Sequence, residues 1–211
     1  METVENIINT DFPYEFVGGT LVLDLVNTES LKHGKRRELL TDLERLHWWW
    51  NEVQTHHAYV ERVASPPLNE DRLLASVQTF RGMMRRMFTA VIEHRAVDQA
   101  DLDVLNKALT LGQRSIVQQG DGTFAKIYRS NDEMSRVMLP LALSAYHLLT
   151  EGDLTRLHKC QNETCTRLFY DQTKNATRQW CTPKCLDKVR SRKRYAQRKA
   201  NDSDPSESPS V

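Results

Sequence analysis

The stretch CQNETCTRLFYDQTKNATRQWCTPKC, residues 160–185, holds all four cysteines of a chain of 211 residues. The spacing is C-x4-C, then fifteen residues, then C-x3-C. Two short cysteine pairs separated by about 12 to 20 residues are the sequence form of a structural zinc site. Four thiolates fill a tetrahedron around the metal, so no position stays open for a catalytic water. We therefore predict one structural Zn²⁺ ion held by Cys160, Cys165, Cys181 and Cys185.

The same cysteines allow two other arrangements. They could form two disulfides in any of three pairings, and His158 could replace one of them as a metal ligand. The first residues, METVENIINTDFPYEF, contain neither a basic cluster nor an apolar core, so we expect no signal peptide. The longest apolar stretch, at 137–149, is shorter than the ~20 residues of a membrane helix. We therefore expect a cytoplasmic protein without a membrane partner, in which clustered cysteines favour metal over disulfides.

The residues around the cysteines predict a small zinc module that ends in a helix. Residues 168–170 are typical of a short strand and residues 179–180 of the start of a return strand, whose aromatic side chains would form a core beside the metal. Thr182 can cap a helix, Pro183 fits a first helical turn, and strong helix formers follow. A knuckle, a hairpin and a helix in this order indicate a treble-clef-like architecture.

The helix predicted after the last cysteine is strongly basic. Because successive residues rotate by about 100°, its charges surround the helix axis and leave only a narrow apolar seam. Such charges repel one another unless an anion lies beside them, and phosphate is the expected anion. The alternatives are a solvated helix, and a helix that binds the acidic front of the chain or a protein partner. The residues predicted to contact nucleic acid are Lys188, Arg190, Arg192, Lys193, Arg194, Tyr195, Arg198 and Lys199.

The charge of the chain is divided between its parts. The net charge is +1, but residues 158–200 carry 12 Lys and Arg against 3 Asp and Glu, whereas residues 1–157 carry 17 against 22. Such a division indicates a nucleic acid or another anionic partner for the basic part. The end, NDSDPSESPSV, is polar and rich in Ser and Pro, which predicts disorder. We therefore predict a helical front domain at 1–155, a zinc module at 156–200 and a disordered tail at 201–211.

Helical periodicity dominates the front domain. Apolar residues step by three and four from Leu73 to Val91, and Gly120-Asp121-Gly122 between two strand-like runs predicts a hairpin. The run LVLDLV at 21–26 could be a strand or a helix, because six residues cannot establish a period. The predicted helices span 42–63, 69–96, 98–109 and 130–150. The predicted fold class is mainly α with a small β-hairpin.

The ends of these helices carry capping signals. Thr41 and Ser130 open capping boxes, and Asn69 is a possible N-cap. Pro140 should kink the last helix of the front domain or start it afresh.

Polar residues inside the apolar run at 21–26 and just after it are candidates for ligand binding. Asp24 and Asn27 are three residues apart, so on a helix they share a face. They could bind a small-molecule effector, or they could brace neighbouring backbone, because buried polar groups need partners.

Three other clusters of side chains in the front domain are more typical of a structural role than of catalysis or ligand binding. Residues Trp48-Trp49-Trp50 cannot all face one way on a helix, so one or two should lie in the core. We expect the adjacent His56 and His57 at the surface, because a metal pair needs an i,i+4 spacing. The methionines Met83, Met84 and Met87 are more typical of a core than of a cofactor site, although such a face could accept an apolar ligand.

The cysteine stretch resembles the CGNR zinc-finger family, whose members carry an N-terminal ABATE domain. The resemblance rests on the C-x4-C pair, Leu168–Asp171, Arg178–Cys181 and the last cysteine with its basic helix. Where the family has Cys-Gly-Asn-Arg, this chain has Cys185-Leu186-Asp187-Lys188, which keeps the metal ligand and a basic fourth residue.

The front of the chain is similar to the same family. Gly18-Gly19 followed by LDLVNT at 23–28 looks like the ABATE signature. The resemblance implies a stress-linked transcription regulator of bacterial type, with its finger on DNA.

We therefore expect a zinc-dependent nucleic-acid-binding protein, and specifically a DNA-binding transcription regulator. Its front domain would sense an effector or form a homodimer, and arginines of the basic helix would read a major groove. A second hypothesis is an RNA- or ribosome-associated zinc protein, because the same charges suit A-form RNA. A third is an enzyme with its chemistry near Asp24. The closed four-cysteine site argues against metal catalysis, and no P-loop, Rossmann or G-x-S-x-G motif occurs, so we expect no enzyme.

Overall fold

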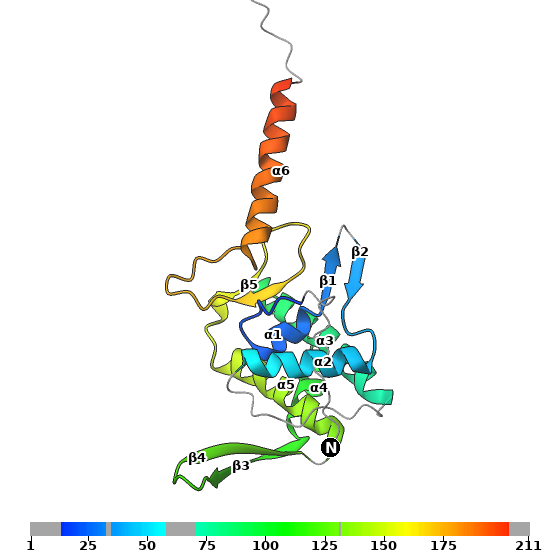
Figure 1. The fold of residues 1–211 in the computed structure, drawn as a ribbon, viewed down its shortest axis with the longest axis vertical. Coiled ribbons are helices and arrows are strands. Elements are labelled where there is room, and N and C mark those ends of the chain that lie inside the picture. Colours follow the sequence, from blue (N-terminus) through cyan, green and yellow to red (C-terminus); the bar gives the residue numbers. More distant parts are fainter. Residues whose placement is uncertain (1–13, 33–34, 58–70, 131, 203–211) are drawn as a thin grey trace, which may run out of the picture.

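The computed structural model describes residues 14–32, 35–57, 71–130 and 132–202 (Figure 1). This part of the chain is mainly helical, with three two-stranded antiparallel sheets, which confirms the predicted fold class. The helices are α1 (Leu21–Val26), α2 (Leu43–His56), α3 (Asp71–Ile92), α4 (Gln99–Leu109), α5 (Glu133–Thr150) and α6 (Pro183–Asp202), with a short 3-10 helix at Leu154–Arg156. The strands are β1 (Glu29–Lys32), β2 (Lys35–Glu38), β3 (Gly112–Gln118), β4 (Phe124–Ser130), β5 (Leu157–Lys159) and β6 (Leu168–Tyr170).

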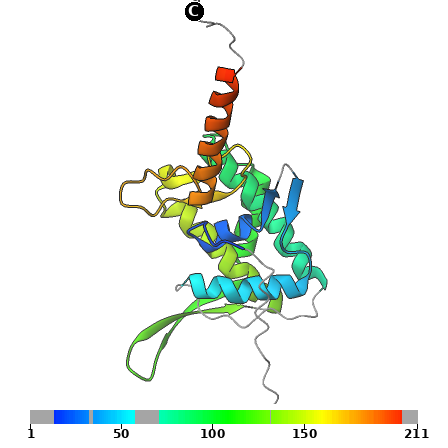
Figure 2. The same ribbon diagram turned by 45° about the horizontal axis from the view of Figure 1, so that its top comes forward.

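The short helix α1 lies at the centre of the molecule. All six of its residues are buried, and it packs against α3, α5 and β6 (Figures 1 and 2). Thr20 caps it, because its side chain accepts a hydrogen bond from the backbone N–H of Leu23. The strand alternative for this segment is therefore wrong. A helix that is apolar on every side suits a position enclosed by other elements.

The core around α1 comes mostly from α2, α3 and α5. Trp49 and Trp50 are buried and Trp48 is half-buried, which confirms that one or two of the three lie in the core. All three methionines of α3 named above are buried as well. His57, by contrast, is only 6% exposed, so the prediction that both histidines lie at the surface is wrong for this residue.

The caps of two helices differ from the sequence prediction. Asp42 and Asp132 cap α2 and α5, in place of Thr41 and Ser130. Each carboxylate accepts a hydrogen bond from the backbone N–H three residues later, at 2.8 and 2.7 Å. An acidic cap also suits the positive end of the helix dipole. Asp98 caps α4, whose range agrees with the prediction.

Helix ends account for most of the remaining differences. Helix α3 ends at Ile92, four residues before the predicted end, and His94 follows in the left-handed conformation with φ of 53°. Helix α5 runs without a break through Pro140 instead of starting afresh there. Helix α2 ends at His56, seven residues before the predicted end at residue 63, and His57 is extended. The predicted cap Asn69 and residues 58–63 lie outside the described residues. So does the tail from residue 203, while residues 201–202 belong to α6.

Two hairpins project from the helical body. The hairpin β3–β4 was predicted, and Gly122 in its turn has a positive φ of 83°. The hairpin β1–β2 was not predicted, because its second strand, KRRE, has no alternation of apolar residues. Among the described residues, no helix is long and apolar enough to cross a membrane. Helix α6 extends away from the body along the longest axis of the molecule (Figure 1).

Candidate zinc centre and nucleic-acid surface

The four cysteine sulfurs converge on one point, as the spacing predicts. All four Sγ atoms lie within 4.8 Å of one another. The Sγ of Cys181 lies 3.7 Å from that of Cys165 and 3.5 Å from that of Cys185. Four sulfurs that surround a zinc ion at ~2.3 Å stand about 3.8 Å apart at the corners of a tetrahedron. The donor set and its spacing therefore fit zinc.

The alternatives for the cysteines do not fit this geometry. All four are free thiols, and the sulfur separations above are far longer than the ~2.05 Å of a disulfide bond. The disulfide alternative is therefore wrong. His158 lies on β5 against the ring of Phe169, with 5.7 Å between ring centroids, and is not part of the sulfur cluster.

A strand pair and the start of a helix position the cysteines. Cys160 follows β5 directly, and Cys165 precedes β6, so the pairing of these strands brings the first two sulfurs together. Cys181 and Cys185 flank the start of α6. The backbone N–H of Cys185 donates to the carbonyl and the hydroxyl of Thr182, at 3.1 and 3.3 Å. The predicted cap and the predicted start of the helix are thus confirmed, while the strand that pairs with β6 is β5 rather than the residues at 179–180.

The sulfurs interact strongly with one another. Hydrogen bonds from the thiols of Cys165 and Cys181 lower the pKa of Cys160. Donation to Cys160 correspondingly raises the pKa values of those two thiols, and burial adds to the effect. Four thiolates at this spacing repel one another unless a cation lies among them, and a divalent cation removes that repulsion.

A small core and a buried carboxylate support the metal centre. Phe169 is fully buried beside the cysteines, and the guanidinium of Arg178 lies 4.4 Å from the centre of its ring. Asp171 is also buried, and its carboxylate accepts hydrogen bonds from the backbone N–H groups of Thr173 and Arg178, at 2.8 and 2.7 Å. Burial alone would raise the pKa of Asp171, but the side chain of Thr173, together with these two backbone hydrogen bonds, outweighs it and the pKa is lowered. The loop between β6 and the last cysteine pair is thereby held in place.

The zinc module packs directly on the front domain. The backbone N–H of Tyr170 donates to the carbonyl of Gly18 at 2.8 Å, and Gly19, with φ of 80°, lies under the same tyrosine. A Cβ atom on Gly18 would lie 2.7 Å from the backbone nitrogen of Asp24, so no larger residue fits there. The carboxylate of Glu15 accepts hydrogen bonds from Arg167 and Lys184, at 2.7 and 2.8 Å.

Asp24 and Asn27, the candidate ligand-binding residues of the front domain, form hydrogen bonds with other residues of the protein. The side-chain amide of Asn27 donates to the carbonyl of Leu168 at 2.8 Å and accepts from its N–H at 2.9 Å. The carboxylate of Asp24 accepts from the N–H of Gly18 at 2.9 Å and lies 2.7 Å from Nε2 of His57. These contacts brace neighbouring backbone, as the structural alternative predicts. Ligand binding by Asp24 and Asn27 stays a prediction.

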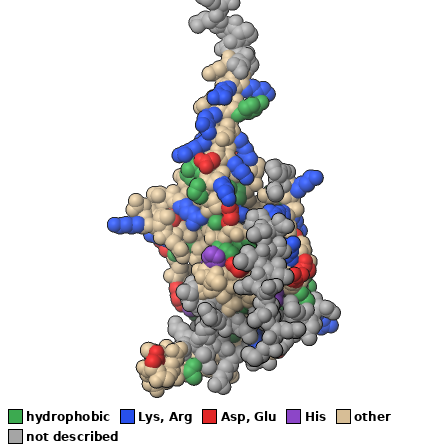
Figure 3. All heavy atoms as spheres, viewed as in Figure 1, with side chains coloured by type: hydrophobic (Ala, Val, Ile, Leu, Met, Phe, Trp, Pro, Cys, Tyr) green, Lys and Arg blue, Asp and Glu red, His purple; other side chains and the backbone are tan. Residues whose placement is uncertain are grey.

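Helix α6 presents the predicted basic residues to solvent. From Arg190 to Asn201 every residue of the helix is exposed, and Tyr195 is 72% exposed. Arg192 differs from the others, because its guanidinium donates to Asn162 at 3.0 Å and to Thr164 at 2.7 Å. These contacts hold α6 against the knuckle, the loop of residues 160–165. The sequence did not predict this role for Arg192. On the face that Figure 3 shows, Lys and Arg side chains lie along both sides of the projecting helix.

A cavity of about 620 Å³ lies between α3, α4 and α5 in the front domain. Most of its lining is apolar, and Met83 is the one residue of the α3 methionine cluster that reaches it. The charged residues at its edge are Arg72, Arg86, Asp101 and Lys107, of which Arg86 and Asp101 form an ion pair at 2.5 Å.

The comparison with protein families agrees with this architecture. Residues 19–152 match the ABATE family, whose description is "Putative stress-induced transcription regulator". The chain belongs to the ABATE family. Residues 156–199 match the CGNR zinc finger, which confirms the resemblance seen in the sequence. The front of this chain is thus an ABATE domain, and the four cysteines of its CGNR finger bind one structural zinc ion. No curated protein matches the sequence.

Proposed function

We propose that this ABATE-family protein is a DNA-binding transcription regulator that acts in the cytoplasm by binding rather than by catalysis. The observation that carries the proposal is α6, a 20-residue basic helix that projects from the zinc centre with its charges in solvent. Such a helix suits the major groove of duplex DNA, where arginines contact phosphates and guanine edges. Lys188, Arg190, Lys193, Arg194, Tyr195, Arg198 and Lys199 are the proposed contacts.

Zinc has a structural role in this proposal. The ion supplies the cross-link that a module of this size cannot obtain from burial alone. Side chains and backbone groups of the finger position α6. Cys185 and Thr182 fix its first turn, and Arg192 holds its third turn against the knuckle. The helix therefore leaves the finger in one direction, which a groove-binding helix requires.

The ABATE domain is the proposed sensor of the regulator. Its cavity has the size of small-molecule sites in proteins, about 300 to 1,000 Å³, and a mostly apolar lining with a few charged groups. An effector bound there would contact α3, and α3 contacts the finger through Arg85, whose guanidinium donates to the carbonyl of Thr166 at 2.8 Å. A homodimer formed through the ABATE domain stays part of the proposal.

Binding to nucleic acids by the zinc-loaded full-length protein tests the proposal. Fluorescence anisotropy with a mixed-sequence DNA duplex and with an RNA hairpin, over a salt series, would compare the wild type with R190Q/R194Q/R198Q. Arg192 is left intact because it holds the helix in place. We expect zinc-dependent duplex binding, and a salt dependence in the variant that is shallower by roughly 0.9 for each phosphate that the variant no longer neutralises.

A matched control and the other outcomes complete the design. The variant R95Q/R136Q removes two exposed cations of the ABATE domain that do not border the cavity, and it should bind as the wild type does. Absence of duplex binding at low salt would contradict the proposal. A clear preference for the RNA hairpin would instead favour an RNA- or ribosome-associated zinc protein.

A further inference from the structure

The hairpin β1–β2 adds little to the core of the molecule. None of the residues of its two strands whose burial is described is buried, and Leu31 is 38% exposed. Its second strand begins with three consecutive basic residues, Lys35, Arg36 and Arg37. Because side chains alternate along a strand, Arg36 lies on one face of the hairpin and its two neighbours lie on the other. Both faces near its tip are therefore basic.

The base of this hairpin is anchored to α3 by two arginines one turn apart. Arg81 is only 1% exposed; its guanidinium donates to Glu38, which follows the basic residues, and lies 3.7 Å from Glu29. Arg85 donates to the backbone carbonyl of Glu29 at 2.7 Å. Burial of an arginine is costly unless it is paired. Arg81 is buried and Arg85 is half-buried, and both direct their guanidinium groups to the base of the hairpin.

The same anchor holds the finger. Arg85 donates to Glu29 at the start of β1 and to Thr166, the residue after the zinc ligand Cys165. One guanidinium therefore fixes the orientation of the hairpin relative to the zinc module that carries α6. In Figures 1 and 2 the end of the hairpin at which β1 stops and β2 begins points to the same end of the molecule as α6, and Figure 3 shows basic side chains both along α6 and beside the hairpin.

We propose that the β1–β2 hairpin is a second DNA-contacting element. It lies on the phosphate backbone beside the groove that α6 occupies, and its contacts are Lys35, Arg36 and Arg37. The partner is duplex DNA, since two basic elements held at a fixed orientation match two features of one rigid double helix, a groove and its flanking backbone. Arg36 has an exposed ion pair with Glu29, at 3.0 Å, which a phosphate can replace.

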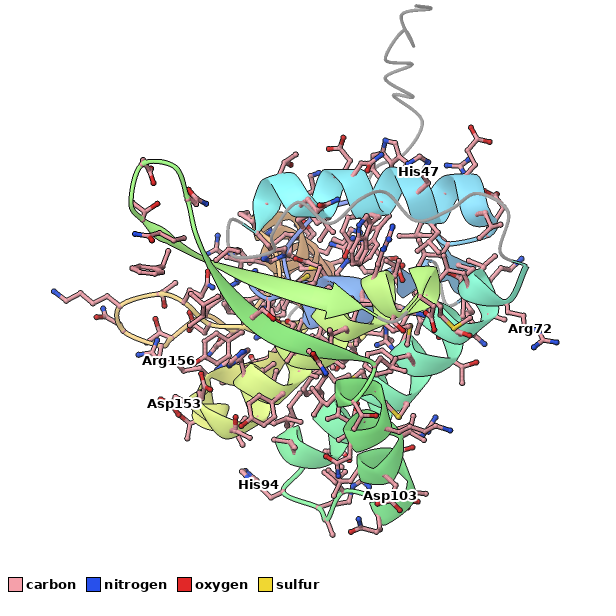
Figure 4. All side chains as sticks on the ribbon, turned by 90° about the horizontal axis from the view of Figure 1, so that it is seen from below. His47, Arg72, His94, Asp103, Asp153 and Arg156 are labelled. Carbon is pink, nitrogen blue, oxygen red and sulfur yellow. The ribbon has the colours of Figure 1, made fainter. Side chains whose placement is uncertain are left out.

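This inference rests on the proposed function, and the experiment separates the two. The zinc-loaded full-length protein would be titrated onto a mixed-sequence duplex over a salt series, with K35Q/R36Q/R37Q beside the wild type. The anchors Arg81 and Arg85 stay unchanged, and an unaltered circular dichroism spectrum and melting temperature would show that the variant is folded. R190Q/R194Q/R198Q reports on α6, and R95Q/R136Q is the control for a loss of positive charge elsewhere on the ABATE domain. The first turn of α5, which carries Arg136, lies at the end of the molecule away from α6 (Figure 1), and Arg72 at the start of α3 (Figure 4) stays unchanged because it borders the cavity.

We expect the hairpin variant to bind more weakly, with a salt dependence shallower by about 2 to 3, because each neutralised phosphate contributes about 0.9. Hydroxyl-radical footprinting should show a shorter protected length of backbone for this variant than for the wild type. If the hairpin variant binds like the charge control while the α6 variant loses affinity, the hairpin inference is overturned and the proposed function stands. If the wild type does not bind duplex DNA, or prefers the RNA hairpin, both are overturned.

Discussion

The side chain of Asn27 is one of the contacts between the ABATE domain and the finger. Its amide makes both a donor and an acceptor contact to the backbone of Leu168, in the manner of a strand partner, and both residues are buried. In N27A the N–H and the carbonyl of Leu168 would be left buried without partners. We expect the free energy of unfolding to fall by about 2 to 5 kcal/mol, measured by urea denaturation.

Asn106, exposed on α4, offers the matched substitution for this prediction. N106A should change the free energy of unfolding by less than about 0.5 kcal/mol. A value for N27A as small as that for N106A would show that the contact with Leu168 adds no stability.

Glu15 gives the molecule a predictable response to acid. The hydrogen bond from Lys184, followed by that from Arg167, lowers the pKa of Glu15 below its ordinary value. A carboxyl group whose pKa is lower in the folded state stabilises the fold above the unfolded pKa of about 4.3. That stability is lost as the pH falls through the folded pKa. We expect E15Q to be less stable than the wild type at pH 7, by about 1 kcal/mol or less for this partly exposed group.

Thermal unfolding between pH 7 and pH 3 would check this expectation. The difference between E15Q and the wild type should shrink below pH 4 and vanish once Glu15 is protonated in the folded state. E163Q, at an exposed position in the finger, should show no such dependence. A difference that stays constant down to pH 3 would count against the role of Glu15.

At the scale of elements, α3 is the support for both the hairpin and the finger. The guanidinium of Arg85 donates to the carbonyls of Val26, Glu29 and Thr166, which belong to three different segments. A lysine in its place keeps the charge, but its single ammonium group cannot match the planar fork of an arginine. In R85K we expect faster amide hydrogen exchange in β1 and in the knuckle, with a loss of about 1 to 3 kcal/mol in stability.

The neighbouring Arg86 provides the comparison for this prediction. It forms an ion pair with Asp101 at the edge of the cavity and is 66% exposed. R86K should leave hydrogen exchange in β1 and in the knuckle unchanged. Equal effects of R85K and R86K would mean that the contacts of Arg85 do not connect the two segments.

The elements that sequence predicted are those with a local signal. The zinc ligands follow from spacing within 26 residues, and α3 and α4 follow from a regular period of apolar residues. The strand LFY at 168–170 was recognised, but its partner β5, only three residues long, has no pattern of its own. The hairpin β1–β2 was missed because charged residues fill a strand that faces solvent. It is held by the buried Arg81 and the half-buried Arg85, whose contacts in the hairpin are 43 and 56 positions away in the sequence.

Residues of the site could be predicted where they lie close together in the sequence, but not where their partners are distant in it. The exposed basic helix was predicted from composition, but the contacts of Arg192 depend on residues about 30 positions away. Asp24 and Asn27 were identified as polar residues that need partners, yet the partner of Asn27 is 141 residues distant. Neither periodicity nor spacing carries information about such a pair.

At the scale of the whole molecule, the finger and the ABATE domain share one core. Leu157 of β5 and Leu168 of β6 are buried in the same cluster as α1, α3 and α5. Removal of zinc should therefore destabilise the ABATE domain as well as the finger. We expect chelation to lower the melting temperature by at least about 10 °C, because a loss of even ~5 kcal/mol shifts a domain of this size by that much.

Two probes would separate the parts in this experiment. Far-UV circular dichroism reports on all helices, and the tryptophan fluorescence of W180F reports on Trp48, Trp49 and Trp50 of α2, of which the last two are buried in the ABATE core. Both should show the same lower midpoint after chelation and recover when zinc is added back. A fluorescence midpoint unaffected by chelation would show that the ABATE domain is stable on its own.

The contact between Asn27 and Leu168 also has a consequence for the order in which the protein matures. The ribosome releases α1 early, but the strand that covers it is made about 140 residues later. The buried face of α1 therefore stays without its final neighbour until the finger has left the exit tunnel and its thiols have captured the metal. Metal loading is then the step that completes the packing around α1, and a cell short of zinc would accumulate chains in which α1 packs on α3 and α5 but lacks β6.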